Sequence, residues 1–221
     1  MRKAMIAGMM ALAGLGAGAG QAVEETACRV TVYLQDEQVA NPHVMFRAKA
    51  MAAGIFAEIG IRLRWAIGEP QGERRGKGNA GSLRARREIA IRMASHAPKE
   101  LQPGAWGYAF PYARSGVRVT LFSDRILTLA KGGVEAGGIL LAHVLAHEIA
   151  HMLQGIARHS EAGVMKAQWT EEDTIQMRRK PLSFTSHDAD LIHLALGCGD
   201  AAPHSTSLAA AAPDPASTAR F

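Results

Sequence analysis

The sequence has little excess of charge of either sign. Its 25 lysines and arginines compare with 20 aspartates and glutamates, a formal net charge of +5. Without the first 22 residues, which include Arg2 and Lys3, the balance is 23 basic against 20 acidic residues. A surplus this small argues against a nucleic-acid partner. The chain also lacks internal repeats, and its 48% hydrophobic and 20% charged residues are typical of one ordinary globular domain.

Basic residues are clustered between residues 73 and 92. They surround a Gly-rich stretch at residues 68–86, which indicates an exposed loop. A solvated loop surface accounts for this basic cluster, and a site for an anionic ligand is the alternative. The members of the cluster are Arg74, Arg75, Lys77, Arg84, Arg86, Arg87 and Arg92.

The first 22 residues have the pattern of a secretory signal peptide. A basic start, Arg2-Lys3, precedes an uncharged run that lasts until Glu24 and closes with small residues up to Ala22. Cleavage is expected after Ala22, which places the mature protein in a bacterial periplasm or outside the cell. The alternative is an uncleaved membrane anchor, because the run is just long enough to span a bilayer. Its Ala and Gly content argues against insertion, so no membrane span is expected after cleavage.

Cysteine is scarce. The two cysteines, Cys28 and Cys198, lie near opposite ends of the predicted folded region. In an oxidising compartment they can form one bridge between the first strand and the last helix, and the alternative is two unpaired thiols. Residues 23–199 are expected to form a single domain. Residues 200–221 are mainly Ala, Pro, Ser and Thr, which predicts a disordered C-terminal tail.

Local patterns predict strands and helices through the domain. Residues 28–35 alternate β-branched and polar side chains, as a half-buried strand does, and Asn41-Pro42 opens a helix over 42–58. Gly60 ends that helix, and a strand, a helix and a strand with short connections predict a βαβ unit with parallel strands. The other predicted elements are strands at 61–67, 88–94 and 116–122, and helices at 125–131, 138–154, 170–179 and 186–196, with Gly132-Gly133 and Gly137-Gly138 flanking the start of the long helix.

Trp106 to Phe110 is a short aromatic-rich segment bounded by glycine and proline. These features predict an edge strand. An edge strand has unpaired backbone groups that can bind an extended peptide by strand addition, so Trp106, Gly107 and Tyr108 are candidate substrate-binding residues. A turn whose aromatic rings fill the core is the alternative.

The chemistry of the chain is concentrated in His147-Glu148-Ile149-Ala150-His151 on the long apolar helix. Two histidines four residues apart lie on one face of a helix, so both can bind one metal ion, and Glu148 can reach its bound water. A catalytic zinc ion takes three protein ligands and keeps one position for water. The pattern therefore predicts Zn²⁺ as the cofactor, with His147 and His151 as ligands and Glu148 as the general base.

The third ligand must come from a segment that folds back over the helix. Gly155 allows a sharp turn at the end of the helix, and His159, four residues later, is the first choice. Glu171 and Glu172 are the competitors, because some zinc enzymes with the same pentapeptide use a later glutamate. The weaker candidates are Glu161 and His187.

His143 lies one turn before His147 on the same helix face. A ligand pair of His143 and His147 is geometrically possible, but it would leave Glu148 and His151 without a role. A hydrogen-bonded histidine in the core or behind the metal ligands is therefore favoured. The helix has almost no other polar residue, so it must be buried, and each of these polar groups then needs a partner.

These residues resemble the metzincin zinc proteases. The shared features are the His147-Glu148-x-x-His151 order, a glycine, a third histidine followed by Ser160, and a nearby methionine. The resemblance implies that Met165 is the methionine of the turn below the metal. It also implies an α+β fold: a twisted mixed sheet of four or five strands with an antiparallel edge strand, a backing helix, a long active-site helix and C-terminal helices.

The chain departs from the metzincin motif at two places. His159 comes eight residues after His151, two more than in metzincins, and Ala150 replaces a glycine that many members have. The departure leaves the third ligand open between His159 and a later glutamate. A similar ending, with serine, glycine, methionine and Trp169, occurs in a divergent group of bacterial exported proteins.

The predicted function is an exported zinc metalloendopeptidase that hydrolyses peptide bonds by a zinc-activated water, with Glu148 as general base. Its partner would be a peptide or protein substrate. A metzincin-shaped zinc-binding or interaction protein with little turnover is the alternative, since no inhibitory propeptide is recognisable. A third interpretation is a coincidental pentapeptide in a buried helix. The sequence leaves open the cleavage preference, latency and the oligomeric state.

Overall fold

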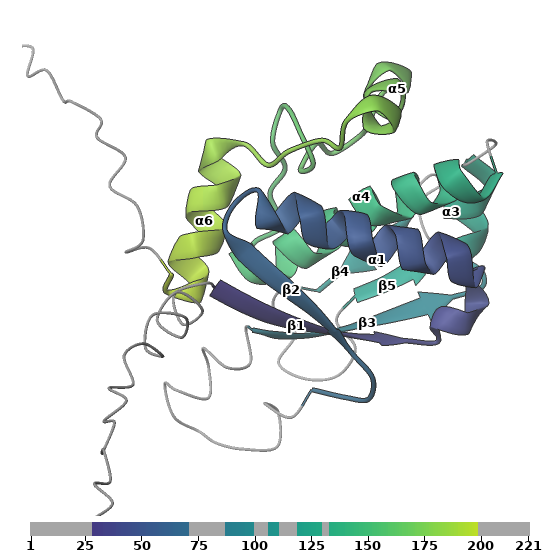
Figure 1. The fold of residues 1–221 in the computed structure, drawn as a ribbon, viewed down its shortest axis with the longest axis horizontal. Helices are drawn as coiled ribbons and strands as arrows, with labels where there is room; N and C mark the ends of the chain where they lie inside the picture. Colours follow the sequence, from purple (N-terminus) through teal and green to yellow (C-terminus); the bar gives the residue numbers. More distant parts are fainter. Residues whose placement is uncertain (1–27, 71–86, 100–105, 111–118, 130–132, 199–221) are drawn as a thin grey trace, which may run out of the picture.

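The computed structural model describes residues 28–70, 87–99, 106–110, 119–129 and 133–198. The predicted signal peptide at 1–22, the predicted tail at 200–221 and most of the Gly-rich loop at 68–86 lie outside these described residues. Figure 1 shows a sheet with helices above one of its faces.

The first three elements form the predicted βαβ unit. Asn41 caps the helix by accepting a backbone N–H, and Pro42 occupies its first position. Gly60, with φ of 73°, allows the turn into the next strand, which runs parallel to the first. The bounds agree with the prediction to within one residue: β1 (Cys28–Gln35), α1 (Pro42–Ala57) and β2 (Ile61–Ala66).

The sheet is mixed and has five strands in the order β2-β1-β3-β5-β4. The remaining strands are β3 (Glu88–Ala94), β4 (Gly107–Ala109) and β5 (Val119–Phe122). All neighbours pair in parallel except β4, which is antiparallel to β5. The predicted edge strand is thus confirmed for residues 107–109, and the alternative of a core turn is wrong. The predicted strand at 116–122 is described from Val119 onward.

Gly107 brings β4 close to its neighbour. A Cβ atom at this position would lie 2.6 Å from Leu121 Cδ2 and 2.8 Å from the Thr120 carbonyl oxygen. Only a residue without a side chain permits this approach between the two strands.

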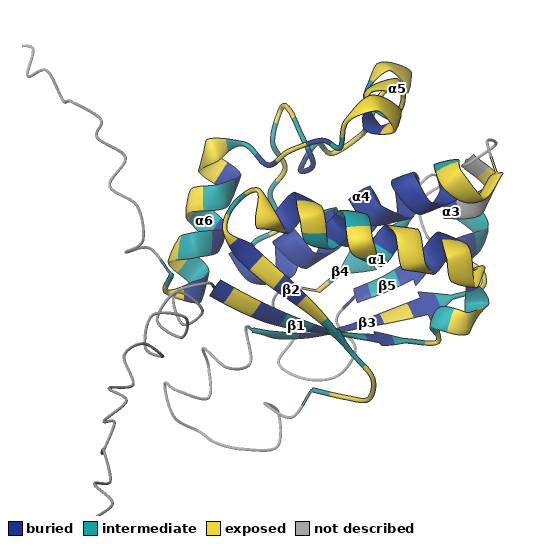
Figure 2. Ribbon diagram, viewed as in Figure 1, coloured by how far each residue is buried: buried dark blue, intermediate teal, exposed yellow. Residues whose placement is uncertain are grey.

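The helices are α3 (Ser123–Leu129), α4 (Gly133–Gln154), α5 (Glu171–Arg179) and α6 (Ser186–Leu196), and a short 3-10 helix, η1 (Glu37–Val39), follows β1. Helices α1 and α4 pack against each other, and α6 packs against α4 (Figure 1). The residues between the sheet and α1 and α4 are buried, while the outer faces of α1, α5 and α6 are exposed (Figure 2). The short helix α3 starts two residues before its predicted position.

The long helix α4 begins at Gly133, five residues before the predicted start. Gly137 and Gly138 were predicted to flank the entry to the helix, and they lie inside it. The physical reason is packing, because a Cβ atom on Gly138 would lie only 2.9 Å from Cδ of Arg47 on α1. Among the described helices, α4 alone is long and apolar enough to cross a membrane, but it is mostly buried in protein. It is therefore the central helix of the core.

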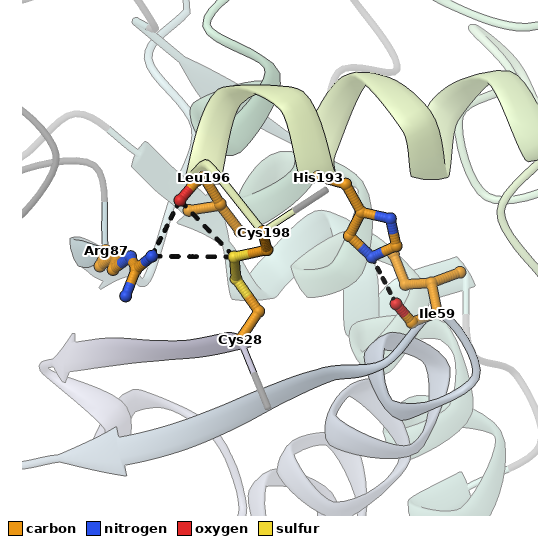
Figure 3. The surroundings of a disulfide bond; sticks show 6 residues. All are labelled: Cys28, Ile59, Arg87, His193, Leu196 and Cys198. Atoms are coloured by element: carbon orange, nitrogen blue, oxygen red, sulfur yellow. Dashed lines mark hydrogen bonds between the residues drawn. A yellow bond between two sulfur atoms is a disulfide. The ribbon is translucent and has the colours of Figure 1, made fainter. Parts of the chain in front are cut away.

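A disulfide joins Cys28 at the start of β1 to Cys198 just after α6, with their Cα atoms 6.0 Å apart. The predicted bridge is confirmed. Figure 3 shows that His193 on α6 also reaches the connection between α1 and β2, since its Nε2 lies 2.6 Å from the Ile59 carbonyl oxygen. Helix α6 is thus attached to the sheet region at two points.

Two members of the basic cluster, Arg87 and Arg92, lie within the described residues. Arg87 is half-buried, and its guanidinium donates to the Leu196 carbonyl at 2.9 Å and lies 3.7 Å from Cys198 Sγ (Figure 3). Arg92 lies 3.6 Å from an Asp36 carboxylate oxygen. The interpretation as a solvated surface does not hold for the half-buried Arg87, whereas Arg92 is exposed as that interpretation expects. The other members of the cluster lie outside the described residues.

Candidate metal centre

Three histidines converge at the C-terminal half of α4. His147 and His151 project from one face of the helix, with their Nε2 atoms 3.0 Å apart. Gly155, with φ of 68°, turns the chain at the end of the helix, and His159 then folds back toward the pair. One ligand nitrogen from each histidine lies within 4.8 Å of the others. The structure therefore brings together all three predicted ligands.

The backbone fixes the tautomers of the two helix histidines. Nδ1 of His147 lies 2.9 Å from the Val164 carbonyl oxygen, and Nδ1 of His151 lies 3.2 Å from that of Ile156. A carbonyl oxygen can only accept, so in each ring Nδ1 carries the hydrogen and Nε2 keeps a lone pair when the ring is neutral. Burial lowers the pKa of both histidines to about 4, and hence both are neutral at pH 7.

Two Nε2 lone pairs that face each other at 3.0 Å cannot hydrogen-bond and repel unless a cation lies between them. A tetrahedral zinc ion with bonds of about 2.0–2.1 Å separates its nitrogen ligands by roughly 3.3 Å, close to the distance found here. His159 supplies a third nitrogen from the exposed side of the site. The donor set and its spacing therefore fit a zinc ion with an open fourth position.

Glu148 lies between the two ligands in sequence, and its side chain is buried. Burial raises the pKa of its carboxyl group to about 7. A general base works best when its pKa is near the working pH, because it can then both take and return a proton. The environment of Glu148 thus suits the role predicted for it.

The segment after His159 locks His147 in place. The Val164 carbonyl accepts from His147, and the Val164 N–H donates to Ser183 at 3.1 Å. Met165 is fully buried, and its carbonyl accepts the Ser160 N–H at 2.7 Å. Met165 therefore follows directly on the residue that orients a ligand, and its predicted role as the methionine below the metal stays a prediction.

Trp169 connects the edge strand to the histidines. Its ring lies nearly perpendicular to the His147 ring at 5.8 Å and packs on Trp106 at 5.2 Å. Its indole N–H donates to the Gly163 carbonyl at 3.3 Å. The sequence analysis placed Trp169 in a shared ending but predicted no contact between it and the histidines.

The predicted substrate-binding residues Trp106, Gly107 and Tyr108 lie on or beside β4, which contacts α4. Tyr108 packs on Phe122 of β5 at 5.8 Å. Within the described residues, β4 pairs on one side only. Substrate binding by these three residues stays a prediction.

His143 is a core histidine. It is fully buried, its Nδ1 lies 2.7 Å from the Ile139 carbonyl oxygen, and its Nε2 accepts the Leu182 N–H at 3.0 Å. Both ring nitrogens therefore have protein partners. The core interpretation is confirmed, and a ligand pair of His143 and His147 is excluded.

The competing third ligands lie elsewhere. In the part of the chain that the structure describes, the three histidines form the single group of His, Cys, Asp and Glu side chains close enough to share an ion. Glu171 and Glu172 lie exposed in the first turn of α5 and do not belong to this group. The weaker candidates Glu161 and His187 are also exposed. Asp188, which no sequence argument singled out, is fully buried behind the His159 loop.

Comparisons with known proteins give weak likenesses. No protein-family model matches the chain, and no curated protein matches it significantly. Among solved structures, an archaemetzincin from Methanopyrus kandleri is 13% identical with a TM-score of 0.44, covering 81% of this chain and 99% of its own. A zinc-dependent peptidase from Methanocorpusculum labreanum is 12% identical with a TM-score of 0.45, covering 74% of this chain and 99% of its own. Scores this low carry no argument about function, which has to come from the site itself.

Proposed function

We propose that this protein is a zinc-dependent peptidase that hydrolyses peptide bonds in peptide or protein substrates. The observation that carries the proposal is the pair of Nε2 lone pairs of His147 and His151, fixed 3.0 Å apart by carbonyl partners on their Nδ1 atoms. His159 completes a set of three nitrogen ligands. Three ligands and a neighbouring carboxyl group suit a catalytic site better than a structural one, which has four ligands.

A zinc ion held by the three histidines would polarise the carbonyl group of the substrate and acidify a water molecule. Glu148 accepts a proton from the attacking water and returns it to the nitrogen of the leaving amine. Its pKa of about 7 permits both transfers near neutral pH. The buried helix α4 holds Glu148 and two of the ligands in fixed relation to each other.

We propose that the substrate binds along β4 as an added strand. Among the described strands, β4 is the last in the sheet and has no neighbour on its outer side, and it contacts α4, which carries the ligands. Trp106 beside this strand packs on Trp169, which contacts His147. An extended peptide on β4 would therefore run close to the metal centre.

The experiment is hydrolysis of quenched fluorescent peptides by zinc-loaded mature protein. Glu148→Gln should lower kcat/KM by about 10²–10⁴-fold, the usual contribution of a general base, and should still bind one zinc ion per chain. Glu135→Gln on the same helix, an exposed residue paired with Arg47 at 2.8 Å, is the matched control and should keep full activity. A zinc-binding protein without turnover would show no hydrolysis in the wild type, which would refute the peptidase.

We also propose that the protein is exported to the periplasm or beyond. The basic and apolar pattern of residues 1–22 supports export, as does the Cys28–Cys198 disulfide, since such bridges persist in oxidising compartments. Expression of the full sequence in a bacterium, followed by N-terminal sequencing of the periplasmic protein, should show cleavage after Ala22. A full-length protein retained in the cytoplasm would contradict this.

A further inference from the structure

Asp188 is one of two buried carboxyl groups among the described residues, the other being Glu148. It lies in the first turn of α6, and its two oxygens accept from two different segments. Oδ2 accepts from the Thr185 N–H at 3.2 Å and the Thr185 hydroxyl at 2.6 Å, which closes the capping box of α6. Oδ1 accepts from the Arg158 guanidinium and the Ser160 hydroxyl, both at 2.7 Å.

Arg158 and Ser160 are the residues on either side of His159. The His159 ring contacts the rings of His147 and His151, with centroids 5.3 and 5.0 Å away, but in the described part of the chain it makes no hydrogen bond. The two helix histidines, by contrast, each have a backbone carbonyl on Nδ1. The position of His159 is therefore set through its neighbours.

Asp188 is also charged. Burial by itself would raise its pKa, but hydrogen bonds from Thr185, Ser160 and Arg158 outweigh burial and hold the pKa below its usual value. The carboxylate is therefore ionised at neutral pH. Its negative charge favours positive charge on His147 and His151, and it would favour a cation among the histidines for the same reason.

We propose that Asp188 is a positioning residue for the third metal ligand. It clamps Arg158 and Ser160, and so it holds the His159 imidazole against His147 and His151 before the metal binds. This inference rests on the proposed function in one respect, that a metal ion binds to the three histidines. Without the clamp, metal binding would have to order the loop, and the affinity would fall.

The test is the zinc affinity of the purified mature protein, measured by competition with a chromophoric chelator. Asp188→Asn should weaken zinc binding by about 10–100-fold, the range for residues that orient a ligand. When loaded with Co²⁺, the Asp188→Asn variant should absorb visible light less strongly than the wild type does, as the His159→Ala variant should. Thr185→Ala is the matched control, because it breaks the same capping box but leaves both bonds to the His159 loop in place, and its affinity should be unchanged.

Two further variants keep the test independent of stability. Ser160→Ala removes one clamping bond while Arg158 and Thr185 still pair the buried Asp188 carboxylate, and it should give a smaller loss of affinity in a fully folded protein. Because Asp188 acts through His159, the double variant Asp188→Asn/His159→Ala should bind zinc no more weakly than His159→Ala alone.

The outcomes separate the two claims. A wild type with far less than one zinc ion per chain after zinc-replete expression overturns the proposed function. If the wild type and its His159→Ala variant behave as expected, the clamp alone is overturned by any of three results. The first is an unchanged zinc affinity in both Asp188→Asn and Ser160→Ala. The second is a loss of affinity in Thr185→Ala as large as that in Asp188→Asn. The third is a double variant, Asp188→Asn/His159→Ala, whose loss of affinity is the sum of the two single losses.

Discussion

The two parts of the metal centre are held by different forces. His147 and His151 sit on α4, whose surface is buried on almost every side by apolar residues. His159 is an exposed residue on the loop after Gly155, and polar contacts from Asp188 hold the residues beside it. We call the first part the helix half and the second part the loop half.

The difference predicts two kinds of sensitivity. Apolar packing gives the helix half its stability, while the spacing of its two ligands follows from the helix itself, through residues four apart. The loop half contributes few apolar contacts, so its ligand geometry depends on hydrogen bonds that span about thirty residues of sequence. Substitutions in the helix half should therefore change the free energy of unfolding more than the zinc affinity, and substitutions in the loop half should do the reverse.

Leu145→Ala should have the largest effect on stability. Leu145 is fully buried on the side of α4 away from the ligands, and the cavity left by a truncated leucine costs about 2–5 kcal/mol. Chemical denaturation of the metal-free protein measures this loss. At a temperature where the variant is folded, its zinc affinity should stay close to that of the wild type. A large loss of affinity in folded Leu145→Ala would break the comparison.

Removing the disulfide should come next. Replacing both Cys28 and Cys198 by serine releases a link across 170 residues, which typically lowers the free energy of unfolding by about 2–4 kcal/mol. Helix α6 keeps its packing through Ile192 and Leu196, so Asp188 should stay in place and zinc binding should persist. Calorimetry and zinc titration of the double variant test this. Loss of zinc binding in the folded variant would mean that the loop half depends on the bridge.

Glu148→Gln in metal-free protein probes the helix half through pH. The folded-state pKa of Glu148 is raised from 4.5 to about 7, so the folded wild type binds an extra proton between these values. The stability linked to this proton is present below pH 4.5 and is lost as the pH rises through 7. The free energy of unfolding of the variant, taken relative to that of the wild type, should therefore rise by up to about 3 kcal/mol between pH 4 and pH 8.

Denaturation of both proteins across this pH range measures the effect, with the exposed Glu135→Gln as control. Parallel stability profiles for the wild type and Glu148→Gln would show that Glu148 is not buried in solution.

The helix half could be predicted from the sequence because its information is local. Spacing placed His147 and His151 on one face, and the apolar composition of residues 138–154 indicated burial. The glycine turn at Gly155 was equally local, and its φ of 68° agrees with the prediction. The elements with strong local patterns, β1, β3 and α6, have the predicted bounds.

The loop half could be predicted only in part. The sequence favoured His159 but could not exclude Glu171 or Glu172, because the path of a loop depends on distant partners. Asp188 was missed, although Thr185-x-x-Asp188 is a recognisable capping box. This local motif would account for the residue by itself, and nothing in the sequence points to its second set of bonds. Gly138 was misplaced for a similar reason, since its contact with Arg47 crosses between helices.

Gly163→Ala tests the contact by which the chain after His159 orients a ligand of the helix half, the Val164 carbonyl that accepts from His147 Nδ1. Gly163 has φ of 74°, and a Cβ atom there would clash with the Ser183 carbonyl oxygen, the acceptor for Val164. The left-handed backbone costs alanine only about 1–2 kcal/mol, but relieving the clash must shift the turn that holds His147 and Met165. Zinc affinity, measured by chelator competition, should fall by about tenfold.

Gly60→Ala is the matched control for Gly163→Ala, because Gly60 has nearly the same φ of 73° and open space around a Cβ atom. It imposes the same backbone strain far from the metal centre but without the clash, and so it should lose less stability than Gly163→Ala and no zinc affinity. If both variants bind zinc like the wild type, the turn can move without disturbing the ligands, and the Val164 carbonyl is not needed to orient His147. If only Gly163→Ala loses affinity, the cause is the position of the loop and not a general loss of stability.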